Sequence, residues 1–250
     1  MAKMVEILDR SSMVDRLKRD LVVDPERTAI ITIDMHRGHL DPKVATMPAK
    51  PEDCVRVIAA AEKCLANARE HGVPIIHVKL VWRKIPGLGS EGMTVPFWRA
   101  LHGITDEENR LTLGRKSTAN THNLVGSPGT EIIPSLYREG DYVIDNKKRL
   151  DCFMGTDLEN LLSILEVRTV ALMGINTNTC VLNTAYTAFN KDFQVVVIED
   201  CVASMYGDDL HVFGLENVKR CLGWVLSVDE LAAKLATKVA VGRPASAATA

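Results

Sequence analysis

A cysteine, an aspartate and a lysine occur in this sequence where they could combine in nucleophilic chemistry. Cys180 follows the turn GINTNT and is expected to open a helix, where the positive end of the helix dipole and a nearby lysine favour a thiolate. Asp34 ends the apolar run TAIITI, and Lys147 comes two residues after YVID. A carboxylate can take and return the thiol proton. The backbone N–H groups of the turn before Cys180 are also suited to bind an oxyanion.

Each of these residues also fits a purely structural role. A cysteine at a helix start can be a buried core residue, an aspartate after a strand can cap a turn, and a lysine can be solvated. Spacing alone leaves both interpretations open. His36 and His39 follow Asp34 at i, i+3 spacing. Two histidines are too few for a metal site, so we predict no bound metal and no cofactor, and expect hydrogen-bonded or solvent-facing rings.

The elements that must position these residues alternate along the chain. Apolar, β-branched runs predict strands, and stripes of apolar residues at helical spacing predict helices. The predicted strands are 28–33, 74–80, 142–145, 168–174, 194–199 and a short 224–227, and the predicted helices are 52–71, 156–167, 180–193, 208–221 and 227–238. This alternation is typical of right-handed βαβ crossovers in a parallel sheet that is covered on both faces. The carboxyl ends of such strands share one edge, which would bring Asp34, Lys147 and Cys180 together.

Two helix starts carry capping-box spacing. Thr156 and Glu159 are predicted to cap the helix TDLENLLSILEV, and Ser227 and Glu230 to cap the last helix.

The bulk composition excludes several classes of protein. The chain has 250 residues, of which 46% are hydrophobic and 25% are charged, so wholesale disorder is excluded. The formal net charge of −2 disfavours a nucleic-acid binder. The charged N-terminus has no apolar segment typical of a signal peptide, and no apolar run is long enough to span a membrane. The six cysteines are scattered, so we expect free thiols in a cytoplasmic protein.

One domain is expected over residues 1–240, with a long loop insertion at about 83–135 that interrupts the alternation. A connection of this length is usually functional or an oligomer contact. Residues 241–250, VGRPASAATA, are expected to be a disordered tail.

Three motifs in order carry a family resemblance. They are AIITIDMHRGHLD, DNKKRLDCFMGTDLENLL and GINTNTCVLNTAYTAFNKDFQVVVIEDCVAS, and they extend from about residue 25 to about residue 230. With them the chain resembles the isochorismatase-like cysteine hydrolases. The resemblance implies an α/β fold with three α/β/α layers, in which a Rossmann-like six-stranded parallel sheet has helices on both faces. It also implies a catalytic triad of Asp34, Lys147 and Cys180, with Lys148 as the alternative lysine.

The resemblance further implies how the triad would work. A cis peptide bond is expected between Ile175 and Asn176, and the backbone N–H groups of Asn176 and Cys180 would form the oxyanion hole. Asp34 would take the thiol proton, Cys180 would attack a carbonyl, and water would hydrolyse the resulting thioester. The loop HVKLVWRK lacks the D-x-H pattern of the nicotinamidase-like metal site, which is a second reason to expect no metal.

The substrate that the resemblance implies is a small amide or ureide (carbamoyl) compound, cleaved at a C–N bond with release of ammonia. A maleamate-type or other carboxamide amidase is an alternative, and a non-catalytic small-molecule-binding member of the fold is another from a different class. Arg149, Trp82 and Asn178 are candidate substrate-binding residues. Phe97 and Trp98 could wall the pocket or belong to a core or an interface. No nucleic-acid or membrane partner is expected, and the family suggests a homodimer or homotetramer.

Overall fold

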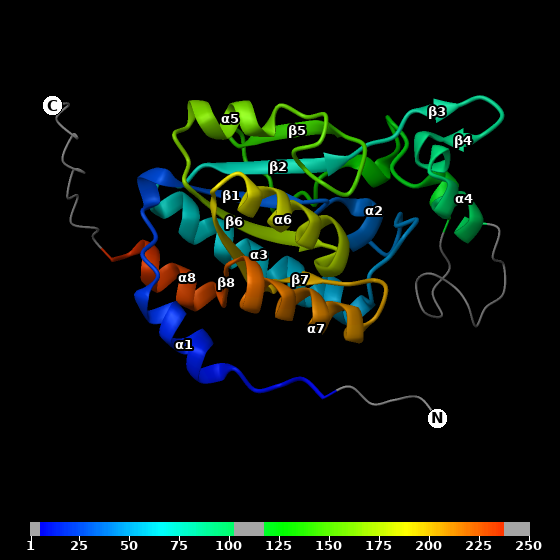
Figure 1. Ribbon diagram of the computed structural model, residues 1–250. Coiled ribbons are helices and arrows are strands. Elements are labelled where there is room, and N and C mark those ends of the chain that lie inside the picture. Colours follow the sequence, from blue (N-terminus) through cyan, green and yellow to red (C-terminus); the bar gives the residue numbers. More distant parts are fainter. Residues whose placement is uncertain (1–5, 103–117, 238–250) are drawn as a thin grey trace, which may run out of the picture.

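The computed structural model describes residues 6–102 and 118–237, and its centre is a parallel sheet of six strands (Figure 1). In sheet order the strands are β5 (Tyr142–Lys147), β2 (Ile75–Leu80), β1 (Thr28–Ile33), β6 (Thr169–Ile175), β7 (Gln194–Ala203) and β8 (Trp224–Leu226). Every neighbouring pair is parallel. The predicted three-layer α/β/α fold with a six-stranded sheet is confirmed.

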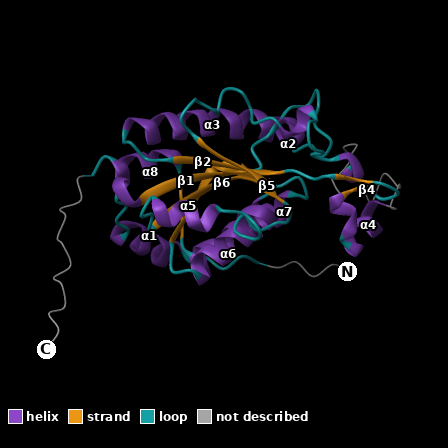
Figure 2. Cartoon of the chain, turned by 90° about the horizontal axis from the view of Figure 1, so that it is seen from above, coloured by secondary structure: helices purple, strands orange, loops and turns teal. Residues whose placement is uncertain are grey.

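Helices cover both faces of the sheet, which explains why its strands are apolar runs rather than alternating patterns. The helices α3 (Pro51–Glu70) and α8 (Val228–Leu235) lie on one face, and α5 (Leu158–Ile164), α6 (Leu182–Asn190) and α7 (Asp208–Asn217) lie on the other (Figure 2). All six residues of β1 are buried. Ile30 packs in the core under α3 and α8, whereas Ile31 packs in the core under α5 and α6, because successive side chains of a strand point to opposite faces.

The helix boundaries follow local chemistry at most ends. Pro51 starts α3, and the chain leaves this helix at Gly72, whose φ is 69°. The predicted capping box of Ser227 and Glu230 is confirmed at α8. The predicted capping box at Thr156 and Glu159 is wrong, because α5 begins at Leu158. The Thr156 hydroxyl accepts a hydrogen bond from the backbone N–H of Leu158 instead.

An N-terminal helix, α1 (Ser11–Asp20), was not expected from the sequence. None of its residues is buried, so it adds nothing to the hydrophobic core. It is attached at the sheet edge near β8, where Trp224 Nε1 donates to the carbonyl of Leu17 and Lys18 Nζ lies 2.9 Å from Glu230.

The predicted insertion contains secondary structure of its own. It includes the hairpin of β3 (Lys84–Ile85) and β4 (Gly89–Ser90), a 3-10 turn at Glu91–Thr94, and α4 (Pro96–His102). Together with the short helix α2 (Arg37–Leu40), these elements lie beyond the carboxyl ends of the strands (Figure 1).

Two predictions, the insertion at about 83–135 and the tail 241–250, fall partly or wholly outside the residues that the structure describes. Residues 103–117 of the insertion and the predicted tail 241–250 lie outside them, and the single domain over 1–240 stays a prediction. Within the described ranges, no helix is both long and apolar enough to cross a membrane.

Candidate active site

The three candidate catalytic residues follow or end three parallel strands at the same edge of the sheet. Asp34 comes directly after β1, and Lys147 is the last residue of β5 rather than two residues beyond it, as the sequence suggested. Cys180 lies in a π-type turn, Thr177–Val181, which follows β6 and leads into α6. The cysteine therefore lies in the first helical turn after β6, and the regular α-helix α6 follows directly at Leu182.

The lysine joins the other two side chains. Lys147 Nζ donates to Asp34 Oδ2 at 2.5 Å and to Cys180 Sγ at 3.3 Å. The second carboxylate oxygen of Asp34 accepts from the backbone N–H of Leu80 at 2.7 Å. Asp34 and Lys147 are completely buried, and Cys180 is 4% exposed. The structure thus brings together the three residues that the sequence placed far apart.

Burial determines the protonation of the thiol. It raises the pKa of Cys180 to about 12, because the low-polarity surroundings and the neighbouring Asp34 charge oppose a thiolate more strongly than the Lys147 ammonium favours it. The prediction of a thiolate, which was based on the helix dipole and a nearby lysine, is therefore wrong for the resting site. Burial also works against the ammonium of Lys147, but the charges of Asp34 and Cys180 raise its pKa above the ordinary lysine value. The resting arrangement is a neutral thiol beside a carboxylate–ammonium pair.

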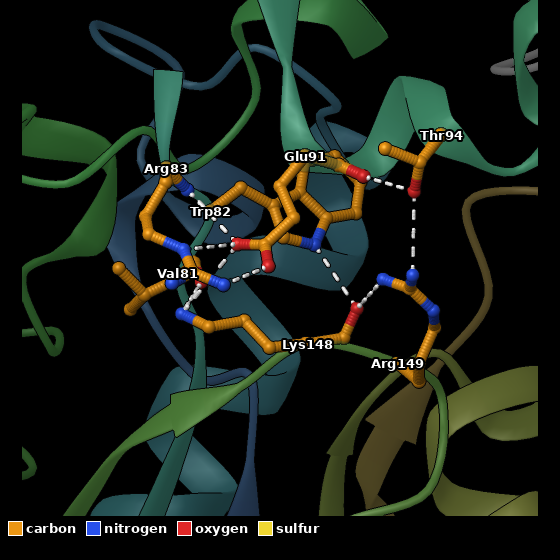
Figure 3. Close-up of polar contacts among 7 residues, drawn as sticks. All are labelled: Val81, Trp82, Arg83, Glu91, Thr94, Lys148 and Arg149. Atoms are coloured by element: carbon orange, nitrogen blue, oxygen red, sulfur yellow. Dashed lines mark hydrogen bonds and ion pairs between the residues drawn. The ribbon is translucent and has the colours of Figure 1, made fainter. Parts of the chain in front are cut away.

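The end of β5, which carries Lys147, is held in place by hydrogen bonds to the segment that follows β2. The backbone N–H of Val81 donates to the Lys147 carbonyl at 3.1 Å, and Lys148 Nζ donates to the Val81 carbonyl. Trp82 Nε1 donates to the Lys148 carbonyl at 3.1 Å (Figure 3). The alternative lysine, Lys148, thus bonds to the segment after β2, whereas Lys147 is the lysine that contacts Cys180.

Arg149 belongs to the same set of contacts rather than to a free binding surface. Its guanidinium donates to the Lys148 carbonyl at 2.8 Å and reaches the Thr94 hydroxyl at 3.3 Å (Figure 3). Arg83 and Glu91, which flank the β3–β4 hairpin, form an ion pair at 2.5 Å, and the Glu91 carboxylate lies 4.0 Å from Lys148 Nζ. These contacts attach the insertion to the chain around Lys147.

A cavity opens beside the thiol, and the empty space within and in front of it, open solvent included, is about 490 Å³. Its described wall is mainly apolar and aromatic, and it is formed by His39, Met47, Leu80, Trp82, Trp98, Leu101, His122, Leu150, Asn176, Thr179, Cys180, Met205 and Tyr206. Of the predicted substrate-binding residues, Trp82 lies in this wall, whereas Arg149 and Asn178 are not among its described residues. The Asn178 side chain accepts from the Ser204 hydroxyl at 2.7 Å.

The predicted oxyanion donors lie at the same cavity. Asn176 and Cys180 both belong to its wall, and the peptide bond between Ile175 and Asn176 is cis, as the resemblance implied. The Asn176 side chain is fixed by the backbone N–H of Met205, which donates to it at 2.8 Å. That the two backbone N–H groups bind an oxyanion stays a prediction.

Three buried histidines lie next to this cavity, and the sequence indicated only two of them. His36 and His39 are joined by His122, and one ring nitrogen of each lies within 4.8 Å of one ring nitrogen of the others. Burial lowers the pKa of all three, most strongly for His36 and His122, so the rings are neutral at neutral pH. No motif marks His122, which is brought to the site by the insertion. No motif marks the cavity residue Tyr206 either, because its place in the wall depends on how the loop after β7 folds.

Comparison with known proteins identifies the family. The isochorismatase domain model matches residues 28–230, a range that includes Asp34, Lys147 and Cys180. The chain belongs to the isochorismatase family. It is 26% identical over 211 residues to the ureidoacrylate amidohydrolase RutB of Methylobacterium radiotolerans, with 83% of this chain and 79% of that protein covered. It is 25% identical to the RutB protein of Acinetobacter baylyi, with 80% of each chain covered.

Solved structures show the same fold. A cysteine hydrolase from Pseudomonas syringae pv. phaseolicola superposes with a TM-score of 0.71 at 20% identity, covering 86% of this chain and 95% of that one. N-carbamoylsarcosine amidase from Thermoplasma acidophilum superposes with a TM-score of 0.57 at 22% identity, covering 81% and 97%.

Proposed function

We propose that this isochorismatase-family protein is a cysteine amidohydrolase that cleaves a C–N bond of a small amide or ureide and releases ammonia. The observation that carries the proposal is the Lys147 ammonium, which bonds to the Asp34 carboxylate and to the Cys180 thiol in the wall of a cavity. Family relatives named as ureidoacrylate amidohydrolases support this reaction class.

The first half of the proposed reaction forms a thioester. Because the resting thiol is neutral, it needs a base, and Asp34 is the carboxylate beside it. Asp34 accepts the proton as Sγ attacks the substrate carbonyl carbon, and Lys147 stabilises the negative charge that develops on sulfur. The backbone N–H groups of Asn176 and Cys180 would bind the oxyanion. When the C–N bond breaks, Asp34 returns the proton to the leaving nitrogen, which departs as ammonia or an amine.

The second half regenerates the enzyme. Asp34, again a carboxylate, takes a proton from water, and the resulting hydroxide attacks the thioester carbonyl. The C–S bond breaks, the acid product leaves, and the sulfur recovers its proton from Asp34. Lys147 keeps its proton throughout, because its pKa is raised.

The described cavity wall favours a compact substrate. It is mainly apolar and aromatic, and no lysine or arginine side chain lies in its described part. A carbamoyl or carboxamide group can approach Sγ there while the rest of a small molecule packs against Trp82 and Trp98.

The decisive experiment is an ammonia-release screen over ureidoacrylate, biuret, N-carbamoyl amino acids, maleamate and nicotinamide. The ureides among these compounds are expected to be hydrolysed by the unaltered protein. Cys180→Ser is expected to lower kcat by roughly 10⁴-fold or more, because it removes the nucleophile. Cys221→Ser is the matched control, because Cys221 is an exposed thiol outside the site.

Trapping of the acyl-enzyme tests the covalent step directly. Rapid quench followed by intact-mass measurement is expected to show one substrate acyl group on the Cys180 peptide of the unaltered protein and none in Cys180→Ser. Full activity in Cys180→Ser, or an acyl group on another residue, would remove the nucleophile assignment. Hydrolysis of maleamate without any of the ureides would replace the ureide class by the carboxamide class.

A further inference from the structure

A cluster of three histidines beside the cavity has no part in the proposed thioester chemistry. His36, His39 and His122 are all buried, and their ring centroids lie 4.6 to 5.8 Å apart. His39 and His122 line the cavity together with Cys180. The first two come from the segment after β1, whereas His122 comes from the far end of the insertion, so the fold assembles the cluster from distant parts of the chain.

Two of the rings are oriented by protein groups on one nitrogen only. His39 Nδ1 donates to the Met47 carbonyl at 2.6 Å, and His122 Nδ1 lies 2.8 Å from the Thr46 hydroxyl. In the described part of the chain, His122 Nε2 is buried without a hydrogen-bond partner, and the contact of His39 with Met47 uses Nδ1 and not Nε2. Metal-ligating histidines typically have this pattern, in which an outer partner fixes the ring and the tautomer while the other nitrogen stays available.

The third ring fits the same pattern once one amide is turned. His36 Nε2 lies 2.7 Å from Asn123 Nδ2, while His36 Nδ1 and Asn123 Oδ1 are both buried without a partner among the described residues. The two ends of an asparagine amide have nearly the same shape. Turning the Asn123 amide lets its oxygen accept from His36 Nε2–H, which leaves a lone pair on His36 Nδ1.

The simplest alternative is a packed cluster of neutral rings without a metal. The free-energy cost of leaving buried ring nitrogens without partners counts against this alternative. A buried polar atom without a partner costs about 1–3 kcal/mol. Unpartnered nitrogens on both His36 and His122 would incur that cost in the same cluster. One cation would satisfy these nitrogens together with His39 Nε2. Zinc–nitrogen bonds of about 2.0–2.1 Å place tetrahedral ligand atoms roughly 3.3 Å apart, so the rings would move inward from a spacing within 4.8 Å.

We propose that His36, His39 and His122 bind one divalent cation of the zinc class, with a further coordination position that faces the cavity. Three neutral imidazoles with an open position are typical of a catalytic zinc site. The cation would supply positive charge to a cavity whose described wall has no lysine or arginine, and it could hold a carboxylate or carbonyl oxygen of a ligand near Cys180. One of the two reasons for expecting a metal-free protein was that the sequence indicated only two histidines, and His122 supplies the third.

The test uses the full chain carrying Cys180→Ser, so that the thiol cannot contribute a ligand. Zn²⁺ is titrated in competition with a chromogenic chelator, and Co²⁺ is added separately to follow its visible d–d absorption. The ligand variants are His39→Gln and His122→Gln. Thr46→Val removes the outer partner of His122 with little change in shape, and it keeps the test valid if a histidine variant fails to fold. His71→Gln is the control, because the His71 ring contacts the Asn67 carbonyl at the end of α3 and is not part of the histidine cluster.

One equivalent of Zn²⁺ is expected to bind, and Co²⁺ is expected to show absorption typical of four-coordinate geometry. Thr46→Val should weaken Zn²⁺ binding by about 10–100-fold. Either ligand variant should weaken it further and abolish the Co²⁺ spectrum, and His71→Gln should change neither. Absence of a saturable equivalent, or equal affinity in His122→Gln, Thr46→Val and the parent, would overturn the proposal. Because Cys180 is already replaced, these outcomes are independent of whether the thioester mechanism holds.

Discussion

The carboxylate of Asp34 and the ammonium of Lys147 lie 2.5 Å apart and are both completely buried. A buried ion pair stabilises a fold only while both partners are present, because removing one leaves an uncompensated charge in a low-polarity environment. The same pair supplies the proposed base and the cation that contacts the thiol. Stability and activity are therefore expected to respond differently to substitutions at these two positions.

Asp34→Asn and Lys147→Met are each expected to abolish activity and to lower the free energy of unfolding by about 3–5 kcal/mol. The double variant should stay inactive yet be less destabilised than the sum of the two single variants, because no unpaired charge remains. Urea unfolding of all four proteins measures this coupling. Additive destabilisation would mean that the two side chains do not interact as the 2.5 Å contact indicates.

The raised pKa of Cys180 predicts slow alkylation of the free enzyme at neutral pH. With a pKa of about 12, the reactive thiolate is a very small fraction at pH 7, and it should increase nearly tenfold for each pH unit until the pKa is approached. Iodoacetamide should therefore label the exposed Cys221 before Cys180 at pH 7. Peptide mass spectrometry over a pH series measures both rates. Preferential labelling of Cys180 at pH 7 would indicate a resting thiolate and remove the need for Asp34 as the base.

The strands were predictable because their burial is visible in residue type. The β1 run TAIITI is buried at all six positions, and the other central strands are similar apolar runs that helices cover on both faces. Asp34, Lys147 and Cys180 lie at or just after the carboxyl ends of three of these strands, so the sequence could place them at one edge of the sheet. The helix α1 was not predictable in the same way, since none of its residues is buried.

What could not be predicted depends on depth and on long-range folding. The helix dipole and a nearby lysine are visible in the sequence and suggested a thiolate at Cys180. The extent of burial is not visible, and it reverses the direction of the pKa shift. Likewise, His122 joins His36 and His39 only because the insertion returns to the cavity, and no local spacing records that contact.

A close backbone approach beside the site predicts a severe effect at Gly174. A methyl group there would lie 1.9 Å from the Ile33 carbonyl oxygen, and the φ of 131° is unfavourable for other residues. Gly174→Ala is expected to cost about 3 kcal/mol or more. Gly155→Ala is the matched control, because Gly155 has a φ of 70° with open space around it and should cost only about 1 kcal/mol. Equal melting temperatures of the two variants would show that the contact with Ile33 is relaxed at little cost.

Gly92 limits the position of one wall of the cavity. A methyl group on Gly92 would lie 2.4 Å from ring atoms of Trp82, and Trp82 lines the cavity while its Nε1 is bonded to the Lys148 carbonyl. Gly92→Ala must therefore push the indole toward the cavity or out of its hydrogen bond. The expected result is a loss of about 1–3 kcal/mol in stability together with an increase in KM that exceeds any change in kcat.

A double-variant comparison separates this steric contact from other effects of the alanine. Trp82→Leu removes the ring atoms that the new methyl group would meet, so adding Gly92→Ala to Trp82→Leu should cost clearly less stability than adding it to the unaltered protein. Thermal unfolding gives the stabilities, and the ammonia-release assay gives KM for each variant. If Gly92→Ala destabilises both backgrounds equally, the methyl group does not act through Trp82, and the indole is not held at the cavity wall by its close packing on Gly92.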